Sequence, residues 1–354
     1  MTEFSINTPK GKREIGPGQP VFIIAEMSCN HHQSYETAVK IIDAAAQAGV
    51  DAVKLQTYTP NTITIDSDKE YFQIKVNEAW QGQTLHQLYQ QAYTPWDWHG
   101  KLKDYAESKG LVLFSFPLDV TAVDFLETLK VDLYKVGSFE VVDIPLLKRI
   151  GQTKKPVIIS RGMASLEELE LAIKTLKDNG CPQVAILHCI SAYPAKPADM
   201  NLLMIPDIAK RFKTVVGLSD HSLGKTAAVA AVALGASIVE KHFILSRAEG
   251  GPDAAYSLEP AEFKDLVLSI RDAEVALGQV QYGAGLKEAE NIIFRKSLFV
   301  VEDVKKGEKF TPKNVRSIRP GHGLEPKYYD QVIGQTAAAD ISRATPLSWS
   351  LIAK

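Results

Sequence analysis

The sequence contains no apolar run that reaches the ~18–20 residues of a membrane-spanning helix. Residues 1–20 are polar and hold no apolar signal core, so we expect neither export by a cleaved signal nor membrane insertion, and we predict a cytoplasmic location. Cysteine is also scarce: Cys29, Cys181 and Cys189 are an odd set without CxxC spacing. This usage fits a reducing compartment and argues against a disulfide framework or a structural zinc site.

The chain also lacks an excess of charge of either sign. Its 354 residues are 45% hydrophobic and 23% charged, with a net charge of −2. A balance this close to neutral gives no reason to expect nucleic acid or an anionic membrane as a partner. Any phosphate site has to come from a local cluster of cations. The composition is typical of a globular protein with one large domain or two unequal ones.

The chain does contain a regular alternation of short apolar runs and amphipathic patterns. The apolar runs, which we interpret as buried strands, are 21–26, 51–56, 111–116, 133–138, 156–161, 184–189, 214–219 and 237–243. Apolar residues recur at three- and four-residue spacing in 34–49, 95–110, 165–180 and 224–236, which predicts helices. Strand then helix, repeated about eight times in roughly 250 residues, indicates an α/β protein with a (β/α)8 TIM barrel. No GxGxxG follows the first strand, which disfavours a doubly wound open sheet.

The alternation is interrupted at 62–94 and ends near Gly278. We expect 62–94 to form a long loop with short helices at the catalytic end of the barrel. Residues 293–354 carry short β-like runs separated by turn signals, without a long amphipathic helix. The sequence therefore predicts a barrel domain over 1–278, a linker over 279–292 and a small, mostly β domain over 293–354.

Polar residues gather where the predicted strands end, and the carboxyl ends of the strands form the active-site face of a TIM barrel. One polar strand end is expected by chance, but packing alone does not explain polar residues at nearly all of them. The set comprises Glu26, Asn30, His31, His32, Lys54, Gln56, Ser115, Lys135, Ser138, Glu140, Ser160, Arg161, His188, Ser191, Tyr193, Ser219, Asp220, His221, Glu240, Lys241 and His242. Together these residues predict a polar basin for a small, anionic, oxygen-rich substrate.

His221 and His242 end neighbouring strands of the predicted barrel. Adjacent strands lie ~4.8 Å apart, so two inward imidazoles can share one divalent metal ion. A lone histidine is more often a hydrogen-bonded core residue, but the pairing favours a ligand pair. Two protein ligands would leave positions for water and substrate, as catalysis requires.

Lys54 and Lys135 lie within otherwise apolar strands. Burial of an unpaired ammonium group is costly, so each lysine either pairs with an acid or binds an anion. With Ser138 and Ser219 close to strand ends as well, we favour a cradle for phosphate or carboxylate. Structural pairing stays open for one of the two lysines.

Glu26 and Glu140 are candidate general acid or base groups. Each could instead neutralise a buried lysine. For Glu26, the last residue of the first strand, we favour a catalytic function. For Glu140 both interpretations stay open.

Ordered motifs along nearly the whole chain resemble the sialic acid synthase family, whose members condense phosphoenolpyruvate with an amino sugar. The motifs are IIAEMSCNH (23–31), AGVDAVKLQTY (48–58), YKVGSFE (134–140), ISRGM (159–163), HCISAYP (188–194), GLSDHS (217–222), ALGASIVEKHF (233–243), GGPD (250–253) and SIRPGHGL (317–324). The resemblance implies a TIM barrel followed by an antifreeze-like (SAF, β-clip) domain. It also implies a domain-swapped homodimer, in which the SAF domain crosses to the active site of the partner subunit.

Three stretches are most similar to those family members that make pseudaminic acid: QTYTPNTIT (56–64), SDKEYFQI (67–74) and YTPWDWH (93–99). This similarity implies 2,4-diacetamido-2,4,6-trideoxy-L-altrose as the acceptor and release of phosphate by C–O cleavage. Synthesis of N-acetylneuraminate or legionaminate is the alternative within the family. Outside it, the alternatives are a Schiff-base aldolase that uses Lys54 or Lys135, and a non-catalytic ice- or carbohydrate-binding protein.

The resemblance also implies roles for individual residues. His221 and His242 would hold the family's divalent metal, Mn²⁺ or Mg²⁺, with Co²⁺ as a further option. Glu26 would lie close to metal-bound water and the reacting centre. The resemblance assigns phosphoenolpyruvate to Lys54, Lys135, Ser138, Ser160 and Ser219, and the amino sugar to Gln56, Glu140, Tyr193, Asp253 and Arg319.

Three positions depart from the family pattern. Phe116 stands where the family often has Ser or Thr near phosphoenolpyruvate, which weakens one phosphate contact. Arg161 replaces a common Thr and would compensate for that loss if it pointed inward. Ser191 stands where sialic acid synthases often place Asn.

Overall fold

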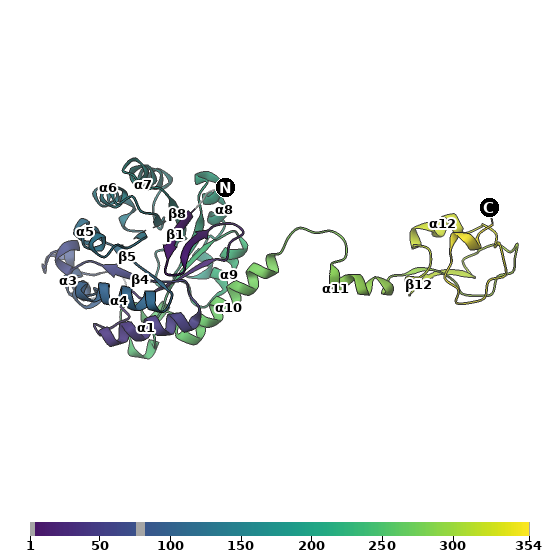
Figure 1. Cartoon of the computed structure of the whole chain (residues 1–354), viewed down its shortest axis with the longest axis horizontal. Coiled ribbons are helices and arrows are strands. Elements are labelled where there is room, and N and C mark those ends of the chain that lie inside the picture. Colours follow the sequence, from purple (N-terminus) through teal and green to yellow (C-terminus); the bar gives the residue numbers. More distant parts are fainter. Residues whose placement is uncertain (1–3, 76–81, 354) are drawn as a thin grey trace. The chain divides into compact units, whose positions relative to one another are not determined.

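The structure is a computed structural model that describes residues 4–75 and 82–353 (Figure 1). Contacts within the chain divide it into two compact units, one that ends at Gly278 and one that begins at Gln279. Of the predicted loop over 62–94, residues 76–81 lie outside the described residues. No helix in the described ranges is long and apolar enough to cross a membrane.

The first unit is built on a closed barrel of eight parallel strands, in which the last strand pairs with the first. The strands are β3 (Phe22–Glu26), β4 (Ala52–Thr57), β5 (Val112–Pro117), β6 (Tyr134–Val136), β7 (Val157–Ser160), β8 (Val184–Cys189), β9 (Val216–Asp220) and β10 (Ile238–His242). Figure 1 shows helices arranged around this barrel. The predicted TIM barrel is confirmed.

Several helices of the first unit, α1, α5, α6 and α7 among them, begin at a residue whose side chain caps the helix. The longer ones are α1 (Tyr35–Ala48), α4 (Trp96–Ser108), α5 (Val120–Thr128), α6 (Ile144–Gln152), α7 (Leu166–Asp178), α8 (Met204–Phe212), α9 (Thr226–Ala233) and α10 (Pro260–Leu277). Short turns are η2 (Glu140–Val142), η3 (Pro197–Asp199), η4 (Arg247–Glu249) and η5 (Ala254–Tyr256). At the start of α1, the Ser34 side chain accepts a hydrogen bond from the Thr37 backbone N–H. At its end, Gly49 has a φ of 86°, a left-handed conformation that glycine adopts with less strain than other residues.

Alternate residues of each strand point into the barrel, and this alternation stacks the interior in layers. The apolar layers consist of Phe22, Ile24, Ala52, Val112, Phe114, Leu133, Ile158, Ala185, Leu187, Val215 and Ile238. The next inward positions toward the carboxyl ends are polar and line a cavity: Glu26, Lys54, Lys135, Ser160, Ser219 and Glu240. The residues between them along each strand face the helices and form the larger core.

An antiparallel hairpin of β1 (Phe4–Thr8) and β2 (Gly11–Ile15) precedes the barrel. Phe4, Ile6 and Ile15 are buried in the same cluster as the inward residues at the strand starts. The hairpin therefore closes the end of the barrel opposite the cavity. We did not predict it from the sequence, because its strands are short and largely polar.

The segment between β4 and α4 carries α2 (Pro60–Ile63), η1 (Glu70–Phe72) and α3 (Leu85–Ala92). Within its described residues, this agrees with the expected loop with short helices. Gln73, Ile74 and Lys75 line the cavity together with one face of α3, so the segment lies at the catalytic end of the barrel, as expected.

The second unit is small and has its own core. Its elements are α11 (Leu286–Ala289), η6 (Glu290–Phe294), β11 (Ser297–Val300), β12 (Val315–Ile318), η7 (Pro326–Tyr328), α12 (Tyr329–Val332) and η8 (Trp349–Leu351). Antiparallel pairing of β11 with β12, and isolated bridges such as Val304 with Ile341, hold its short segments together. The core consists of Leu298, Val300, Val304, Phe310, Val315, Val332, Ala337, Ile341 and Leu347.

Candidate active site

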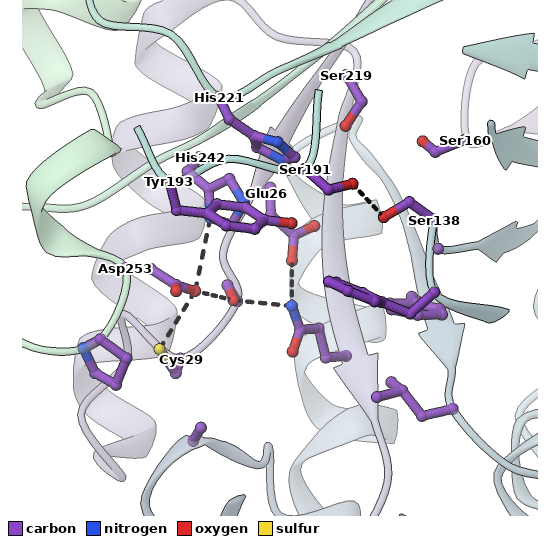
Figure 2. A pocket seen from close by; sticks show the side chains of 18 of the residues that line it. Glu26, Cys29, Ser138, Ser160, Ser191, Tyr193, Ser219, His221, His242 and Asp253 are labelled. Atoms are coloured by element: carbon purple, nitrogen blue, oxygen red, sulfur yellow. Dashed lines mark hydrogen bonds and ion pairs between the residues drawn. The ribbon is translucent and has the colours of Figure 1, made fainter. Parts of the chain in front are cut away.

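A cavity of about 1110 Å³ opens at the carboxyl ends of the barrel strands (Figure 2). Every site residue that we predicted within the barrel lines it: Glu26, Lys54, Gln56, Lys135, Ser138, Glu140, Ser160, Tyr193, Ser219, His221, His242 and Asp253. Arg319 belongs to the second unit, where it is exposed directly after β12. The barrel residues come from all parts of the first unit, and closure of the sheet brings them together.

Two buried lysines share one carboxylate within the cavity. Lys54 Nζ lies 2.6 Å from Glu26 Oε2 and 3.4 Å from Glu240 Oε1. Lys135 Nζ lies 3.4 Å from the same Glu240 oxygen and donates to Ser160 Oγ at 2.8 Å. The sequence favoured an anion cradle over internal pairing, and the structure has both lysines paired. We did not assign Glu240 a role, although it was among the polar strand ends.

The charges of this cluster do not cancel. Burial pushes the pKa of Glu240 upward, but Lys135 and Lys54 outweigh it and hold that pKa well below its usual range. Burial raises the pKa of Glu26, against the opposing effect of Lys54. Glu240 and Glu26 hold Lys54 as a cation, whereas burial lowers the pKa of Lys135. Two lysine side chains beside one firmly ionised carboxylate suit this part of the cavity to an anionic ligand.

The two histidines of the site lie side by side, with ring centroids 5.4 Å apart. His221 Nδ1 lies 2.9 Å from the backbone carbonyl of Ile190, which can only accept, so Nδ1 carries a proton and Nε2 is the nitrogen that could bind a metal. Burial lowers the pKa of this ring, but Cys189 and the Ile190 carbonyl outweigh burial and raise it. Burial lowers the pKa of His242 to about 3, so this ring is neutral, as a metal ligand must be.

The donor set fits a divalent ion with open coordination positions. His242 Nδ1 is buried, lies 3.7 Å from Asp253 Oδ2 and has no hydrogen-bond partner among the described residues. Over residues 4–75 and 82–353, no three or more His, Cys, Asp or Glu side chains are grouped so that they could hold a metal. The histidine pair could therefore hold a metal ion that takes its remaining ligands from water or substrate.

Asp253 anchors a hydrogen-bond network on one wall of the cavity (Figure 2). Its Oδ2 accepts from the Ser28 hydroxyl, and its Oδ1 accepts from the Tyr256 hydroxyl. Gln56 Nε2 donates to Ser28 Oγ at 2.9 Å, which links β4 to this network. We missed Ser28 and Tyr256 because neither ends a strand, and no local pattern marks them.

Some polar residues at the strand ends point away from the cavity. The prediction that these residues line the polar basin is wrong. Lys241 Nζ forms a buried ion pair of 2.7 Å with Asp220 Oδ2 on the neighbouring strand. Both residues sit between inward positions, Ser219 and His221 on one strand and Glu240 and His242 on the other. Because successive side chains alternate, Asp220 and Lys241 face the helices. The same alternation turns Ser115 outward, where it bonds to Thr57.

The structure shows the surroundings of the three residues that depart from the family pattern, Phe116, Arg161 and Ser191. Phe116 lines the cavity, with its ring centroid 5.5 Å from Lys54 Nζ. Arg161 does not line it: its Nε donates to His188 Nδ1 at 3.3 Å, so Arg161 supplies no compensating phosphate contact. Ser191 Oγ donates to Ser138 Oγ at 2.8 Å (Figure 2).

Fold and site define a TIM-barrel enzyme with a cationic pocket and a histidine pair at the carboxyl ends of its strands. The chain belongs to the NeuB family, whose family model matches residues 41–282. The model of the SAF domain matches residues 295–353.

Two relatives named pseudaminic acid synthase match nearly the whole chain. Pseudaminic acid synthase of Campylobacter jejuni subsp. jejuni serotype O:23/36 is 44% identical over 321 residues, 91% of this chain and 93% of that protein. Pseudaminic acid synthase of Helicobacter pylori is 40% identical over 331 residues, 93% of this chain and 97% of that protein. The crystal structure of N-acetylneuraminic acid synthetase from Leptospira borgpetersenii, in complex with citrate, has a TM-score of 0.70 and 32% identity, and covers 82% of this chain and 95% of that one.

Proposed function

We propose that this chain is a pseudaminic acid synthase, which condenses phosphoenolpyruvate with 2,4-diacetamido-2,4,6-trideoxy-L-altrose and releases phosphate by C–O cleavage. The observation that carries the proposal is the convergence of two lysines and two histidines on one cavity. The 44% identity to the Campylobacter pseudaminic acid synthase supports the choice of acceptor. The alternative acceptor is that of an N-acetylneuraminate or legionaminate synthase, since the Leptospira protein has the same fold at 32% identity.

Phosphoenolpyruvate would bind to the cationic part of the cavity. Lys54 and Lys135 both lie 3.4 Å from Glu240 Oε1 and line this part of the cavity, and Ser138, Ser160 and Ser219 add hydroxyl donors. With phosphoenolpyruvate bound by these groups, its enol carbon would face the aldehyde of the open-chain sugar. Positioning of two reactants in attack geometry contributes about 7–11 kcal/mol in favourable cases.

His221 and His242 would hold a divalent metal ion, Mn²⁺ or Mg²⁺, with Co²⁺ as a further option. When bound there, the ion supplies Lewis-acid polarisation of the sugar aldehyde and lowers the pKa of coordinated water. Glu26 would act as the proton acceptor at the reacting centre, because burial raises its pKa toward the working range of a general base. Gln56, Glu140, Tyr193 and Asp253 would orient the sugar from the opposing walls.

The fate of oxygen tests the chemistry. In ¹⁸O-labelled water, C–O cleavage puts the label into C2 of the sugar acid and leaves the released phosphate unlabelled. Mass spectrometry of both products measures this, with a panel of hexosamine acceptors and Mn²⁺ identifying the sugar. Label found only in the phosphate rules out the scheme.

The Schiff-base aldolase is a weaker candidate. The pKa of Lys54 is raised, because Glu240 and Glu26 together outweigh the lowering effect of burial, so this amine is held as a cation. Burial lowers the pKa of Lys135, which leaves that lysine as the candidate nucleophile. Borohydride reduction in the presence of substrate traps a covalent adduct on Lys135 if the aldolase interpretation is right, and traps none for the synthase.

The proposed assembly is a homodimer in which Arg319 of the SAF domain reaches the active site of the partner. The exposed position of Arg319 supports this role. We also propose a cytoplasmic setting, with which three free, buried cysteines are compatible.

A further inference from the structure

One wall of the cavity is apolar and comes from the segment after β4. Leu85, Leu88, Tyr89 and Ala92 follow the spacing of one face of α3 and all line the cavity, together with Ile74. We call these five residues the α3 wall. The opposite face of α3 is polar and solvent-exposed at Gln87, Gln90 and Gln91. An amphipathic helix at a protein surface normally packs its apolar face on the core, whereas this face borders an open cavity.

The α3 wall adjoins the residues proposed to hold the sugar. The Tyr89 ring lies against Tyr58, with centroids 5.7 Å apart, and Tyr58 follows Gln56 by two positions. Tyr89 and Glu140 line the same cavity, and burial, followed by the charge of Glu140, raises the pKa of Tyr89. Burial also raises the pKa of Glu140 to about 7, because burial disfavours the charged form of the carboxyl.

The cavity therefore joins two chemically different regions. Phosphoenolpyruvate carries a phosphate and a carboxylate but no alkyl group that needs an apolar surface, and the lysine cluster suits it. The proposed acceptor carries a methyl carbon at C6 and two acetamido methyl groups. A methyl group gains free energy on an apolar wall, whereas a hydroxyl group there loses hydrogen bonds to water.

We propose that the α3 wall receives a methyl group of the acceptor sugar and so selects a 6-deoxy, 4-N-acylated hexosamine over sugars with hydroxyl groups at these positions. This inference rests on the proposed synthase function and adds its specificity determinant. The methyl group is supplied either by C6 or by the 4-acetamido substituent, and the two sources share the same recognition chemistry. An apolar pocket discriminates by about 10- to 100-fold for a change of this size.

The test measures kcat/KM for four acceptors: the 2,4-diacetamido-2,4,6-trideoxy sugar, its 6-hydroxy analogue, its 4-hydroxy analogue and the analogue with both changes. The variants are Leu88→Asn and Leu85→Asn, and the control is Gln90→Ala on the opposite face of α3. We expect wild type and Gln90→Ala to prefer the trideoxy sugar by about 10- to 100-fold. Each Asn variant should reduce that preference about tenfold or more, with the KM for phosphoenolpyruvate unchanged.

The pair of acceptors whose ratio collapses identifies the source of the methyl group. Loss of the 6-deoxy preference places C6 on the wall, and loss of the 4-acetamido preference places the acyl group there. Ratios that stay the same in a folded Leu88→Asn or Leu85→Asn protein overturn the inference while the synthase function stands. Thermal unfolding reports whether each variant is folded, and Leu85 is the less buried of the two positions.

Failure of the proposed function gives a different result. A wild-type protein that turns over none of the four acceptors contradicts the synthase. The wall is then tested by calorimetric binding of the same four sugars after reduction to their alditols. Tighter binding of the trideoxy form, weakened in Leu88→Asn, supports the inference, and equal affinities overturn it.

Discussion

At the scale of the residue, side-chain direction separates the polar strand ends into two groups. Glu240 and His242 point into the cavity, whereas Lys241 between them pairs with Asp220 outside the barrel. All of these residues are polar and end strands, so residue type alone does not distinguish them. Their place in the alternation of the strand does.

The histidine pair gives a prediction for metal binding. His242→Gln removes one of two imidazoles whose rings lie 5.4 Å apart, so a divalent ion loses half of its protein ligands. We expect Mn²⁺ affinity, measured by calorimetry, and turnover both to fall about 100-fold or more. His86→Gln, outside the cavity lining, is the control and should retain both. Unchanged Mn²⁺ affinity in a folded His242→Gln protein would exclude this ligand pair.

Glu140 gives a prediction for the pH dependence of stability. Burial raises its pKa from 4.5 to about 7, so the folded protein holds this proton more tightly than the unfolded chain. The resulting stabilisation is complete below pH 4.5 and is lost as the pH rises through about 7. A shift of this size corresponds to about 3 kcal/mol.

Glu140→Gln removes the titration, so wild type should lose up to about 3 kcal/mol relative to this variant between about pH 5 and pH 8. Urea denaturation across that range measures the difference. Glu170→Gln, at an exposed position on α7, is the matched control and should give a flat difference. A flat difference for Glu140→Gln as well means that the Glu140 carboxyl is not buried in solution.

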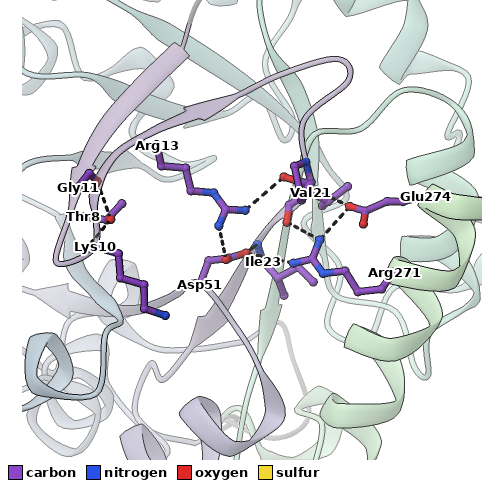
Figure 3. Close-up of polar contacts among 10 residues, drawn as sticks. Thr8, Lys10, Gly11, Arg13, Val21, Ile23, Asp51, Arg271 and Glu274 are labelled. Carbon is purple, nitrogen blue, oxygen red and sulfur yellow. Dashed lines mark hydrogen bonds and ion pairs between the residues drawn. The ribbon is translucent and has the colours of Figure 1, made fainter.

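At the scale of the element, the N-terminal hairpin of β1 and β2 is a part of the first unit that we did not predict from the local sequence. Its apolar residues fill the mouth formed by the strand starts, and its polar residues tie it to the barrel (Figure 3). Arg13 pairs with Asp51 at 2.7 Å, and Asp51 Oδ2 accepts from the backbone of Ile23 at 2.8 Å. Arg271 of α10 donates to the Val21 carbonyl at 3.0 Å in the same network.

This arrangement predicts that the hairpin stabilises the barrel. Phe4 is buried in the cluster inside the barrel, so Phe4→Ala should lower the unfolding free energy by about 3–5 kcal/mol. Ser5→Ala, on the other face of β1, should change it by about 0.5 kcal/mol or less. Urea denaturation followed by circular dichroism measures both. Equal midpoints for wild type and Phe4→Ala would mean that the hairpin is not docked.

At the scale of the whole molecule, the first residues of the second unit, 280–294, carry exposed apolar side chains. Val280, Tyr282 and Leu286 are 93%, 96% and 95% exposed, and Phe294 is largely exposed as well. Apolar groups at this density favour association with another protein surface. A second copy of the chain is the partner that the family resemblance implies, and this homodimer stays a prediction.

The prediction is tested with a chain that ends at Gly278. We expect the full chain to sediment as a dimer and the shortened chain as a monomer that still unfolds cooperatively, because the barrel has its own core. Acceptor KM should rise and turnover should fall, since Arg319 is lost. The single substitution Arg319→Ala separates the two effects: it should raise the acceptor KM and leave the dimer intact. A shortened chain with full activity would contradict a catalytic role of the SAF domain.

The order of the eight barrel strands, the barrel itself, the family and the residue types of the site could all be predicted from sequence alone. These features are local: apolar runs and three- to four-residue spacings mark the elements. Ordered motifs such as GLSDHS carry the family resemblance.

Which polar residues meet could not be predicted from sequence and depends on the folded structure. Glu240 lies between Lys54 and Lys135, and Ser28 and Tyr256 hold Asp253, through contacts between residues far apart in the chain. The same holds for the hairpin that closes the barrel and for the turn of Asp220 and Lys241 away from the cavity. The physical reason is that these contacts depend on strand register and barrel closure, because a shift of one residue reverses the face of every side chain in a strand.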